Sequence, residues 1–168
     1  MFYKKCYKKK KIILTGSEGL LGSSYRTYAE EKGYELFCID KKKIKRKNYF
    51  YCNITNEKQI SKTINSIFKK NYISLLINNA STNPTVDDKL KGFKFSEYNY
   101  TNWKKNLEAD LHGSFLVSKH VLKFFEKQNS GNILNISSIY GMVGPDQKIY
   151  QKKKKKISWF QATRILSC

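Results

Sequence analysis

Short apolar runs alternate with stretches of helical periodicity along residues 11–138. The apolar runs indicate buried parallel strands, because a strand covered by helices on both faces need not alternate polar and apolar residues. Between them, apolar residues recur every three or four positions, which is typical of amphipathic helices. The expected strands are residues 11–15, 34–39, 49–52, 73–77 and 132–136, and the expected helices are 19–32, 55–70 and 103–128. This order predicts an α/β fold with a doubly wound parallel sheet and right-handed crossovers.

Each helix is expected to turn an apolar stripe toward the sheet. Thr55 is placed to cap the second helix, and Gly33 is placed to end the first. The predicted stripes are Leu20, Leu21, Tyr25 and Tyr28 in the first helix, Ile60, Ile64 and Ile67 in the second, and Leu107, Leu111, Phe115, Val117, Val121, Leu122 and Phe125 in the third. The polar segment 82–101 is too long for a simple connection, which favours a functional loop.

The first strand ends in a glycine-rich turn, Thr15-Gly16-Ser17-Glu18-Gly19-Leu20-Leu21-Gly22, and a helix begins inside this turn. Gly16 permits a tight turn, Gly19 lets the backbone approach a ligand, and Gly22 lets the helix pack against the sheet. Unpaired N–H groups at the start of the helix, together with the helix dipole, favour binding of a pyrophosphate. The turn therefore predicts a dinucleotide site made of Gly16, Ser17, Gly19, Leu20, Leu21 and Gly22. An ordinary strand–turn–helix with incidental glycines is the alternative interpretation.

Asp40 follows the second strand, where a carboxylate can accept hydrogen bonds from both ribose hydroxyls of an adenosine. A carboxylate at this place repels a 2′-phosphate, so Asp40 favours NAD over NADP as the cofactor. The neighbouring residues Lys41, Lys42 and Lys43 argue in the opposite direction. A solvated acid at a strand end is the alternative reading of Asp40.

The composition adds little to this picture except a strong positive charge. The formal net charge of +20 comes largely from lysine runs at residues 8–11, 41–43 and 152–156, among many residues that share A/T-rich codons. No nucleic-acid recognition motif accompanies the charge, so we expect no specific nucleic-acid partner. The four cysteines show no metal-ligand spacing and are typical of reduced thiols, so no metal is expected. No apolar run has the length of a membrane span or signal core, which predicts a cytoplasmic protein without membrane contact.

The spaced motifs together resemble the short-chain dehydrogenase/reductase family over residues 11–150. Besides the glycine turn, the resemblance rests on Asn53-Ile54, Asn78-Asn79-Ala80-Ser81, Trp103, Asp110-Leu111-x-Gly113 and Ile136-Ser137-Ser138. A narrower resemblance, to bacterial dehydrogenases of surface-glycan or flagellin-sugar pathways, rests on the long polar loop and on Ser-Ser-Ile-Tyr-Gly followed by Pro145-Asp146. The family has a Rossmann fold, binds NAD(P), and transfers hydride to or from a hydroxyl or carbonyl group. The resemblance implies a small substrate, here one derived from a sugar.

The resemblance also implies roles for single residues. Asn53, Ile54, Asn79 and Ala80 would contact the dinucleotide. The catalytic residues would be Ser138, Tyr150, Lys154 and Asp110, where Asp110 stands in the place of the usual Asn. The glycine spacing is that of the family's sugar-nucleotide epimerase and dehydratase branch, which leaves that branch as an alternative.

The lysine-rich end departs from the family pattern. Tyr150-x-x-x-Lys154 has the family spacing, but residues 152–156 are all lysine, so a Lys at this position would arise by composition alone. A reading-frame slip in adenine-rich DNA could append an unrelated ending. We therefore expect a basic leader at 1–10, a dinucleotide-binding domain at 11–150 and an atypical tail at 151–168, with a sheet incomplete at its C-terminal end. A weakly active or inactive enzyme, or a non-catalytic dinucleotide-binding remnant, would follow, and the family's homo-oligomer would need a further helix.

Overall fold

The computed structural model describes residues 10–82, 99–139 and 142–143. Its elements follow the expected order: β1 (Lys11–Thr15), α1 (Leu20–Glu31), β2 (Glu35–Asp40), β3 (Tyr49–Tyr51), α2 (Glu57–Phe68), β4 (Leu75–Asn78), α3 (Tyr100–Leu107), η2 (Glu108–Gly113), α4 (Ser114–Gln128) and β5 (Asn132–Asn135). The predicted leader up to residue 9, most of the predicted loop (83–98) and the tail at 151–168 lie outside the described residues.

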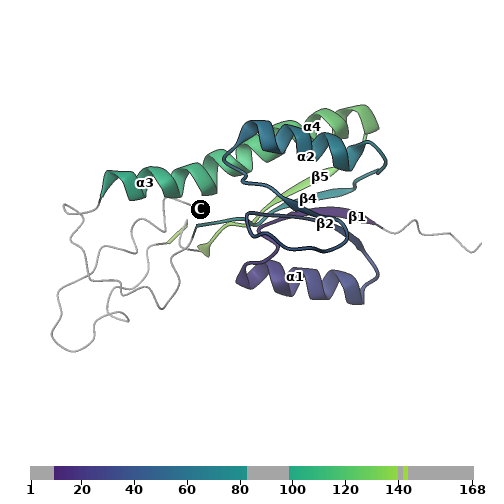
Figure 1. The fold of residues 1–168 in the computed structure, drawn as a ribbon, viewed down its shortest axis with the longest axis horizontal. Coiled ribbons are helices and arrows are strands. Elements are labelled where there is room, and N and C mark those ends of the chain that lie inside the picture. Colours follow the sequence, from purple (N-terminus) through teal and green to yellow (C-terminus); the bar gives the residue numbers. More distant parts are fainter. Residues whose placement is uncertain (1–9, 83–98, 140–141, 144–168) are drawn as a thin grey trace, which may run out of the picture.

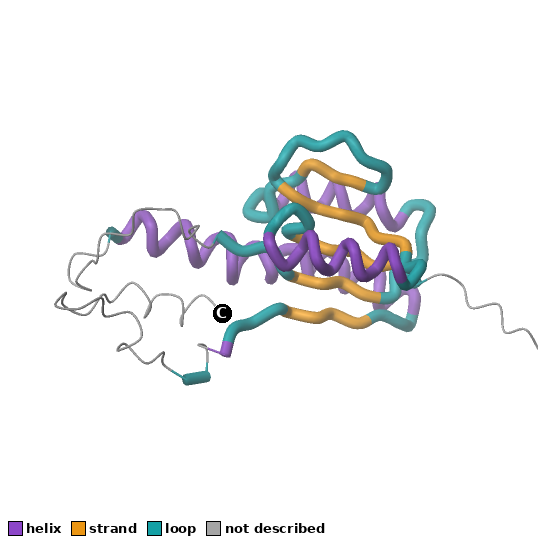
Figure 2. The backbone as a smooth tube through the Cα atoms, turned by 90° about the horizontal axis from the view of Figure 1, so that it is seen from below, coloured by secondary structure: helices purple, strands orange, loops and turns teal. Residues whose placement is uncertain are grey.

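The five strands form one parallel sheet in the order β3-β2-β1-β4-β5. Helix α1 covers one face, whereas α2 and α4 cover the other (Figures 1 and 2). The prediction of a parallel sheet with helices on both faces is confirmed. The sheet is buried because its central strands carry apolar residues on both faces, as at Ile13, Leu14 and Leu76, which are fully buried.

The core lies mainly between the sheet and the pair α2 and α4. The predicted stripe of α2 is confirmed, since Ile60, Ile64 and Ile67 are all buried. Its cap is different from the prediction: the side chain of Asn56, rather than Thr55, accepts the hydrogen bond from the backbone N–H of Gln59. Thr55 instead donates to the side-chain oxygen of Asn53, so the helix begins one residue later.

The predicted stripe of α1 is wrong at three of its four residues, and the fourth, Tyr25, is half-buried. Leu20, Leu21 and Tyr28 are exposed, and the buried residues of α1 are Gly22 and Ala29. These two residues lie two turns apart on one face, and their small size brings the helix backbone close to the rest of the fold. The large apolar side chains at the start of α1 are left at the surface beside the glycine-rich turn.

The long helix expected at 103–128 is interrupted by the π-helical turn η2. The prediction of its broad apolar face is only partly right, because Val117, Val121 and Phe125 are buried while Leu111, Phe115 and Leu122 are exposed. A π-turn inserts one extra residue and shifts the helix face. The stripe that contacts the core is therefore narrow, and the remaining apolar residues point away from it.

Candidate functional site

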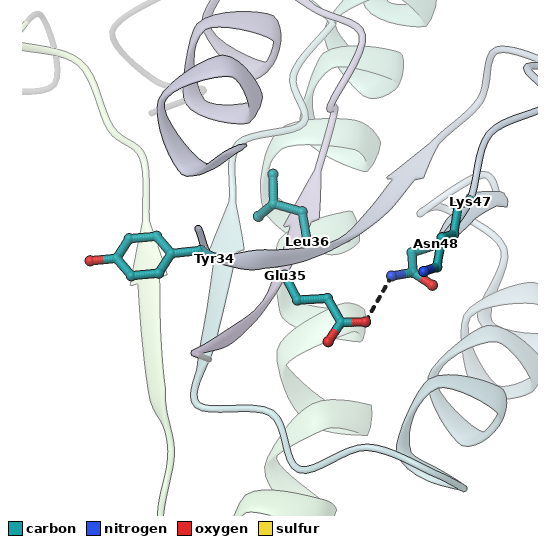
Figure 3. Close-up of a pocket in the computed structure, with 5 residues that line it drawn as sticks. All are labelled: Tyr34, Glu35, Leu36, Lys47 and Asn48. Carbon is teal, nitrogen blue, oxygen red and sulfur yellow. Dashed lines mark hydrogen bonds between the residues drawn. The ribbon is translucent and has the colours of Figure 1, made fainter. Parts of the chain in front are cut away.

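The carboxyl ends of the parallel strands meet at one edge of the sheet, where α/β proteins usually bind ligands. We call the group formed by residues 15–22, 40, 53–54 and 78–80 the carboxyl-end site. An open pocket of about 360 Å³ lies elsewhere, lined by Tyr34, Glu35, Leu36, Lys47 and Asn48. Figure 3 shows these side chains at the amino end of β2, with Glu35 accepting a hydrogen bond from Asn48 at 3.1 Å. This pocket contains none of the predicted site residues.

Two glycines of the turn, Gly16 and Gly22, lie in close contact with neighbouring backbone. Gly16 has φ +66°, and a Cβ added there would lie 2.6 Å from Cα of Ala80. Gly22 differs from the expectation: a Cβ there would meet the carbonyl oxygen of Gly16 at 2.0 Å, so this glycine fits the helix against the turn rather than against the sheet. Ser17 is fully buried within the turn. Only glycine therefore fits at positions 16 and 22.

The start of α1 faces outward from this turn. No side chain caps the helix at Gly19, and Leu20 is 87% exposed. A Cβ on Gly19 would meet only the oxygen of Gly16, at 3.3 Å. The first N–H groups of an α-helix have no partner within the helix. This open end therefore fits the predicted pyrophosphate, which needs close backbone approach and free N–H donors.

Thr15 joins the turn to the end of β4, a role that the sequence interpretation missed. Its hydroxyl oxygen accepts hydrogen bonds from the backbone N–H groups of Asn79 (3.0 Å) and Ala80 (3.1 Å). The side-chain amide of Asn79 donates to the carbonyl oxygens of Thr15 and Gly16, both at 3.1 Å. Asn79 and Ala80, for which the sequence predicts contact with the dinucleotide, thus lie beside the glycine turn. The structure shows Asn79 holding the turn in place.

Asn78, the residue before them, connects three elements. Its buried side-chain amide donates to Ser118 of α4 at 2.9 Å and to Asn135 of β5 at 2.8 Å. Its Oδ1 atom has no hydrogen-bond partner among the described residues. The first Asn of the Asn78-Asn79-Ala80 run therefore fixes β4 against β5 and α4, while the second fixes β4 against the turn.

Asp40 lies next to the turn with its carboxylate held by the backbone. One oxygen accepts the N–H of Glu18 at 2.9 Å, and the other accepts the N–H of Lys42 at 3.0 Å. Lys42 is held in turn by Tyr49, whose hydroxyl donates to its carbonyl oxygen. Burial, and then the negative charges of Asp40 and Glu18, raise the pKa of Tyr49 to about 12, so this donor keeps its proton. The Asp40 carboxylate is thus oriented, and each oxygen retains a further lone pair.

Glu18 was not singled out from the sequence, yet its side chain is only 10% exposed and carries two ion pairs. Its carboxylate accepts hydrogen bonds from Arg46 at 2.7 Å and from Arg26 at 3.3 Å. Burial raises the pKa of Glu18, but the Arg46 hydrogen bond and the charges of both arginines outweigh it and hold the pKa below its usual value. No spacing rule indicates this contact, because Arg46 lies in the connection between β2 and β3.

Asn53 and Ile54 follow β3, next to Asp40, whose carbonyl oxygen accepts the N–H of Cys52 at 2.9 Å. Ile54 is buried, and a Cβ added to Gly113 would lie 2.6 Å from its side chain. Gly113 therefore lets the end of η2 approach the segment that is predicted to face an adenine.

The predicted catalytic residues are described only in part. Asp110 lies in η2, and its carboxylate accepts the N–H of Thr82 at 3.0 Å. π-turns of this kind frequently occur at functional sites. Ser138 follows β5, after Ile136, whose N–H donates to the carbonyl oxygen of Asn78 at 2.9 Å. Tyr150 and Lys154 lie outside the described residues.

Within the described residues, no group of His, Cys, Asp and Glu could hold a metal ion, and no helix is long and apolar enough to span a membrane.

Comparison with known proteins assigns this arrangement to a family. Residues 10–155 match the model of a family described as short chain dehydrogenase. A 3-oxoacyl-[acyl-carrier-protein] reductase of Synechocystis sp. is 34% identical over 113 residues, which are 66% of this chain and 43% of the relative. A post-translational flagellin modification protein A of Campylobacter coli is 33% identical over 100 residues, covering 59% of this chain and 38% of the relative. The chain thus spans about two fifths of the length of these two relatives.

Solved structures share the fold at low identity. ElxO with NADP bound has a TM-score of 0.77 at 22% identity, over 95% of this chain and 62% of that one. A short-chain dehydrogenase from Leptospira borgpetersenii with bound NAD+ has a TM-score of 0.65 at 24% identity, over 84% of this chain and 56% of that one. A nicotinamide dinucleotide is thus common to these proteins, and the two structures differ in which one they contain.

Proposed function

Since the chain belongs to the short-chain dehydrogenase family, we propose that its carboxyl-end site binds NAD for hydride transfer at a hydroxyl or carbonyl group. The observation that carries the proposal is the oriented Asp40 carboxylate beside an uncapped helix start. Such a pair matches the two ends of an adenosine diphosphate: a carboxylate for the ribose hydroxyls and backbone N–H groups for the pyrophosphate.

The remaining residues of the site complete this assignment. The turn from Gly16 to Gly22 would lie against the pyrophosphate, with the N–H groups near Leu20 and Leu21 as donors. Asn53 and Ile54 would border the adenine. Asn79 and Ala80 would border the part of the dinucleotide that follows the pyrophosphate, since they flank the turn on the side of β4.

Asp40 should make the site prefer NAD. A carboxylate close to a 2′-phosphate in a partly wet site repels it by about 1–3 kcal/mol. We expect the wild-type chain to bind NADH about tenfold more tightly than NADPH, and Asp40→Asn to reduce this preference to near equality. Dissociation constants for both dinucleotides, measured by calorimetry, test this. The ratio of the two dissociation constants is compared between variants, because a loss of affinity that affects both dinucleotides equally does not change this ratio.

Glu35→Gln is the matched control for Asp40→Asn. It removes one carboxylate from the same strand but from its opposite end, where the side chain of Glu35 pairs with Lys11 at 3.3 Å. The ratio should therefore stay at its wild-type value. Tighter binding of NADPH than of NADH by the wild-type chain would refute the assignment of Asp40.

For the reaction, we propose the roles that family members give to these positions. Ser138 would donate a hydrogen bond to the substrate oxygen, and Tyr150 would exchange a proton with it. Lys154 would assist Tyr150, and Asp110 would hold the segment at Thr82 beside the substrate. When bound, NAD supplies the hydride acceptor. The substrate class that we favour is a sugar-like alcohol. A sorbose reductase of Candida albicans, 27% identical over 81% of this chain and 52% of its own length, supports this choice.

Loss of the Tyr150 hydroxyl should remove turnover but not binding. If Tyr150 accepts the proton of the substrate hydroxyl, any NADH formation from sugar alcohols should fall by at least about a hundredfold in Tyr150→Phe, the lower end of the range for general acid–base catalysis. The affinity for NADH should change little. A steady-state assay over a panel of sugar alcohols, together with a binding titration, measures both. NADH binding without turnover of any substrate would favour a non-catalytic dinucleotide-binding protein instead.

The proposed function also implies where the protein acts and how it associates. We infer a cytoplasmic site of action, because oxidation of a substrate by NAD draws on a dinucleotide pool such as that of the cytoplasm. We also infer that self-association, where it occurs, follows the family's homo-oligomers. Specific nucleic-acid binding is not part of the proposed function, since no recognition motif accompanies the lysine runs.

A further inference from the structure

Glu18, a residue of the glycine turn, lies at the centre of a cluster of charged side chains that no sequence motif indicates. Arg26 reaches it from α1, Arg46 reaches it from the connection between β2 and β3, and the ammonium group of Lys42 donates to its carbonyl oxygen at 3.0 Å. The Glu18 and Arg26 side chains are 10% and 18% exposed, whereas Arg46 is 35% exposed. A single, nearly buried carboxylate therefore pairs with two guanidinium groups and offsets one of their two positive charges.

The same residue contacts Asp40. The backbone N–H of Glu18 donates to Asp40, and its side chain holds the arginines, so the two arginines lie around the residue that orients the Asp40 carboxylate. This group of five residues contains three cations and two carboxylates, so removal of the Glu18 charge would leave one carboxylate among three cations. The charge of the arginines is offset by Glu18 rather than by Asp40, because the Asp40 carboxylate accepts hydrogen bonds from backbone N–H groups and not from the arginines.

If the ion pairs with Glu18 were broken, the two arginines could bind an anionic ligand beside Asp40. A guanidinium group presents several N–H donors in a plane and is the side chain best suited to a phosphate. A 2′-phosphate adds negative charge to the adenosine ribose that Asp40 is proposed to hold. Free arginines would attract this phosphate and oppose the repulsion from Asp40. With both arginines paired to Glu18, their attraction for this phosphate is weaker, and they offset less of the repulsion from Asp40.

We propose that Glu18 is a specificity-determining residue that favours NAD over NADP by pairing with Arg26 and Arg46 beside Asp40 and offsetting part of their positive charge. The inference rests on the proposed dinucleotide site. The preference for NAD would then depend on two carboxylates: Asp40, which contacts the ribose, and Glu18, which pairs with the arginines.

Two variants with opposite expected effects test the proposal. Glu18→Gln keeps the shape of the side chain and removes its charge, so the affinity for NADPH relative to NADH should rise about five- to tenfold. Arg46→Met leaves the Glu18 charge less neutralised, so the same ratio should fall severalfold. Glu31→Gln is the control, since it removes an equal charge from the exposed end of α1 and should leave the ratio unchanged. Calorimetric titration of each full-length variant with NADH and NADPH gives the ratios.

A purely structural role for the ion pairs predicts a different outcome. Both variants would then loosen the turn and lower the affinity for both dinucleotides, without moving the ratio in opposite directions. Ratios within twofold of wild type, or shifts of the same sign, would overturn the proposal. If Glu18→Gln does not fold, the exposed position of Arg46 lets Arg46→Met decide alone: a lowered ratio supports the proposal, and an unchanged or raised ratio overturns it.

The experiment also separates this proposal from the proposed function. Wild-type chain that binds neither dinucleotide would overturn both. Wild-type chain that binds NADH with an unchanged ratio in the variants would leave the dinucleotide site in place and overturn the role of Glu18 alone.

Discussion

Gly22→Ala is expected to unfold the nucleotide turn and to abolish dinucleotide binding. The added Cβ would lie 2.0 Å from the carbonyl oxygen of Gly16 and 2.9 Å from Cα of Ser17. Both are backbone atoms, so the turn and α1 must separate. We expect a loss of at least about 3 kcal/mol in the free energy of unfolding, at the upper end of the cost of overpacking. Urea denaturation followed by circular dichroism measures this loss.

Gly19→Ala is the matched control in the same turn. The backbone at Gly19 has φ −80° and ψ 175°, which an alanine adopts readily, and its Cβ would meet only the Gly16 oxygen at 3.3 Å. Stability should therefore change by about 1 kcal/mol or less. Affinity for NADH should still fall, because the methyl group extends into the space where a pyrophosphate approaches. Equal stability of the two variants would contradict the packing described for Gly22.

Thr15→Val should have the second largest effect. Thr15 is 1% exposed, and its hydroxyl accepts the N–H groups of Asn79 and Ala80. Valine has the same shape but leaves two backbone donors without this acceptor. We expect a loss of about 2–4 kcal/mol in the free energy of unfolding, and at least a tenfold loss of NADH affinity because β4 no longer holds the turn.

Thr15→Ser separates the hydroxyl from the methyl group. Serine keeps the acceptor and removes only a buried methyl, so the expected loss is about 1 kcal/mol. Urea denaturation of both variants, together with NADH titration, makes the comparison. A valine variant as stable as the serine variant would show that the two hydrogen bonds of Thr15 add nothing to the fold.

The sheet could be predicted because each strand is recorded in local sequence. Runs such as Lys11–Thr15 and Glu35–Asp40 are apolar on both faces, and only a sheet covered on both sides accommodates them. The glycine turn and Asp40 could be located for the same reason, since they directly follow strands. The helix faces were less predictable. In α1 the contact is made by Gly22 and Ala29, and small residues give no hydrophobic signal. In η2 the π-turn shifts the face without a local marker.

The contacts that organise the site could not be predicted, because they join residues far apart in sequence. Arg46 reaches Glu18 across 28 positions, and the N–H of Asn79 reaches Thr15 across 64. Which of the many basic or polar residues meets a given carboxylate is decided by the arrangement of strands, and no spacing in the sequence predicts it. Thr15 had one available signal: it directly precedes the first glycine of the turn and ends a buried strand, where a hydroxyl needs a partner.

The central claim is that the carboxyl-end site binds NAD, and amide chemical shifts during titration with NADH test it most directly. We expect saturable changes in the amide shifts of Gly16, Gly19, Leu20 and Asp40, whereas the amides of Tyr34 and Asn48 at the opposite end of β2 should be unaffected. Absence of saturable changes at the glycine turn, or changes centred on the pocket at Tyr34 and Asn48, would contradict it.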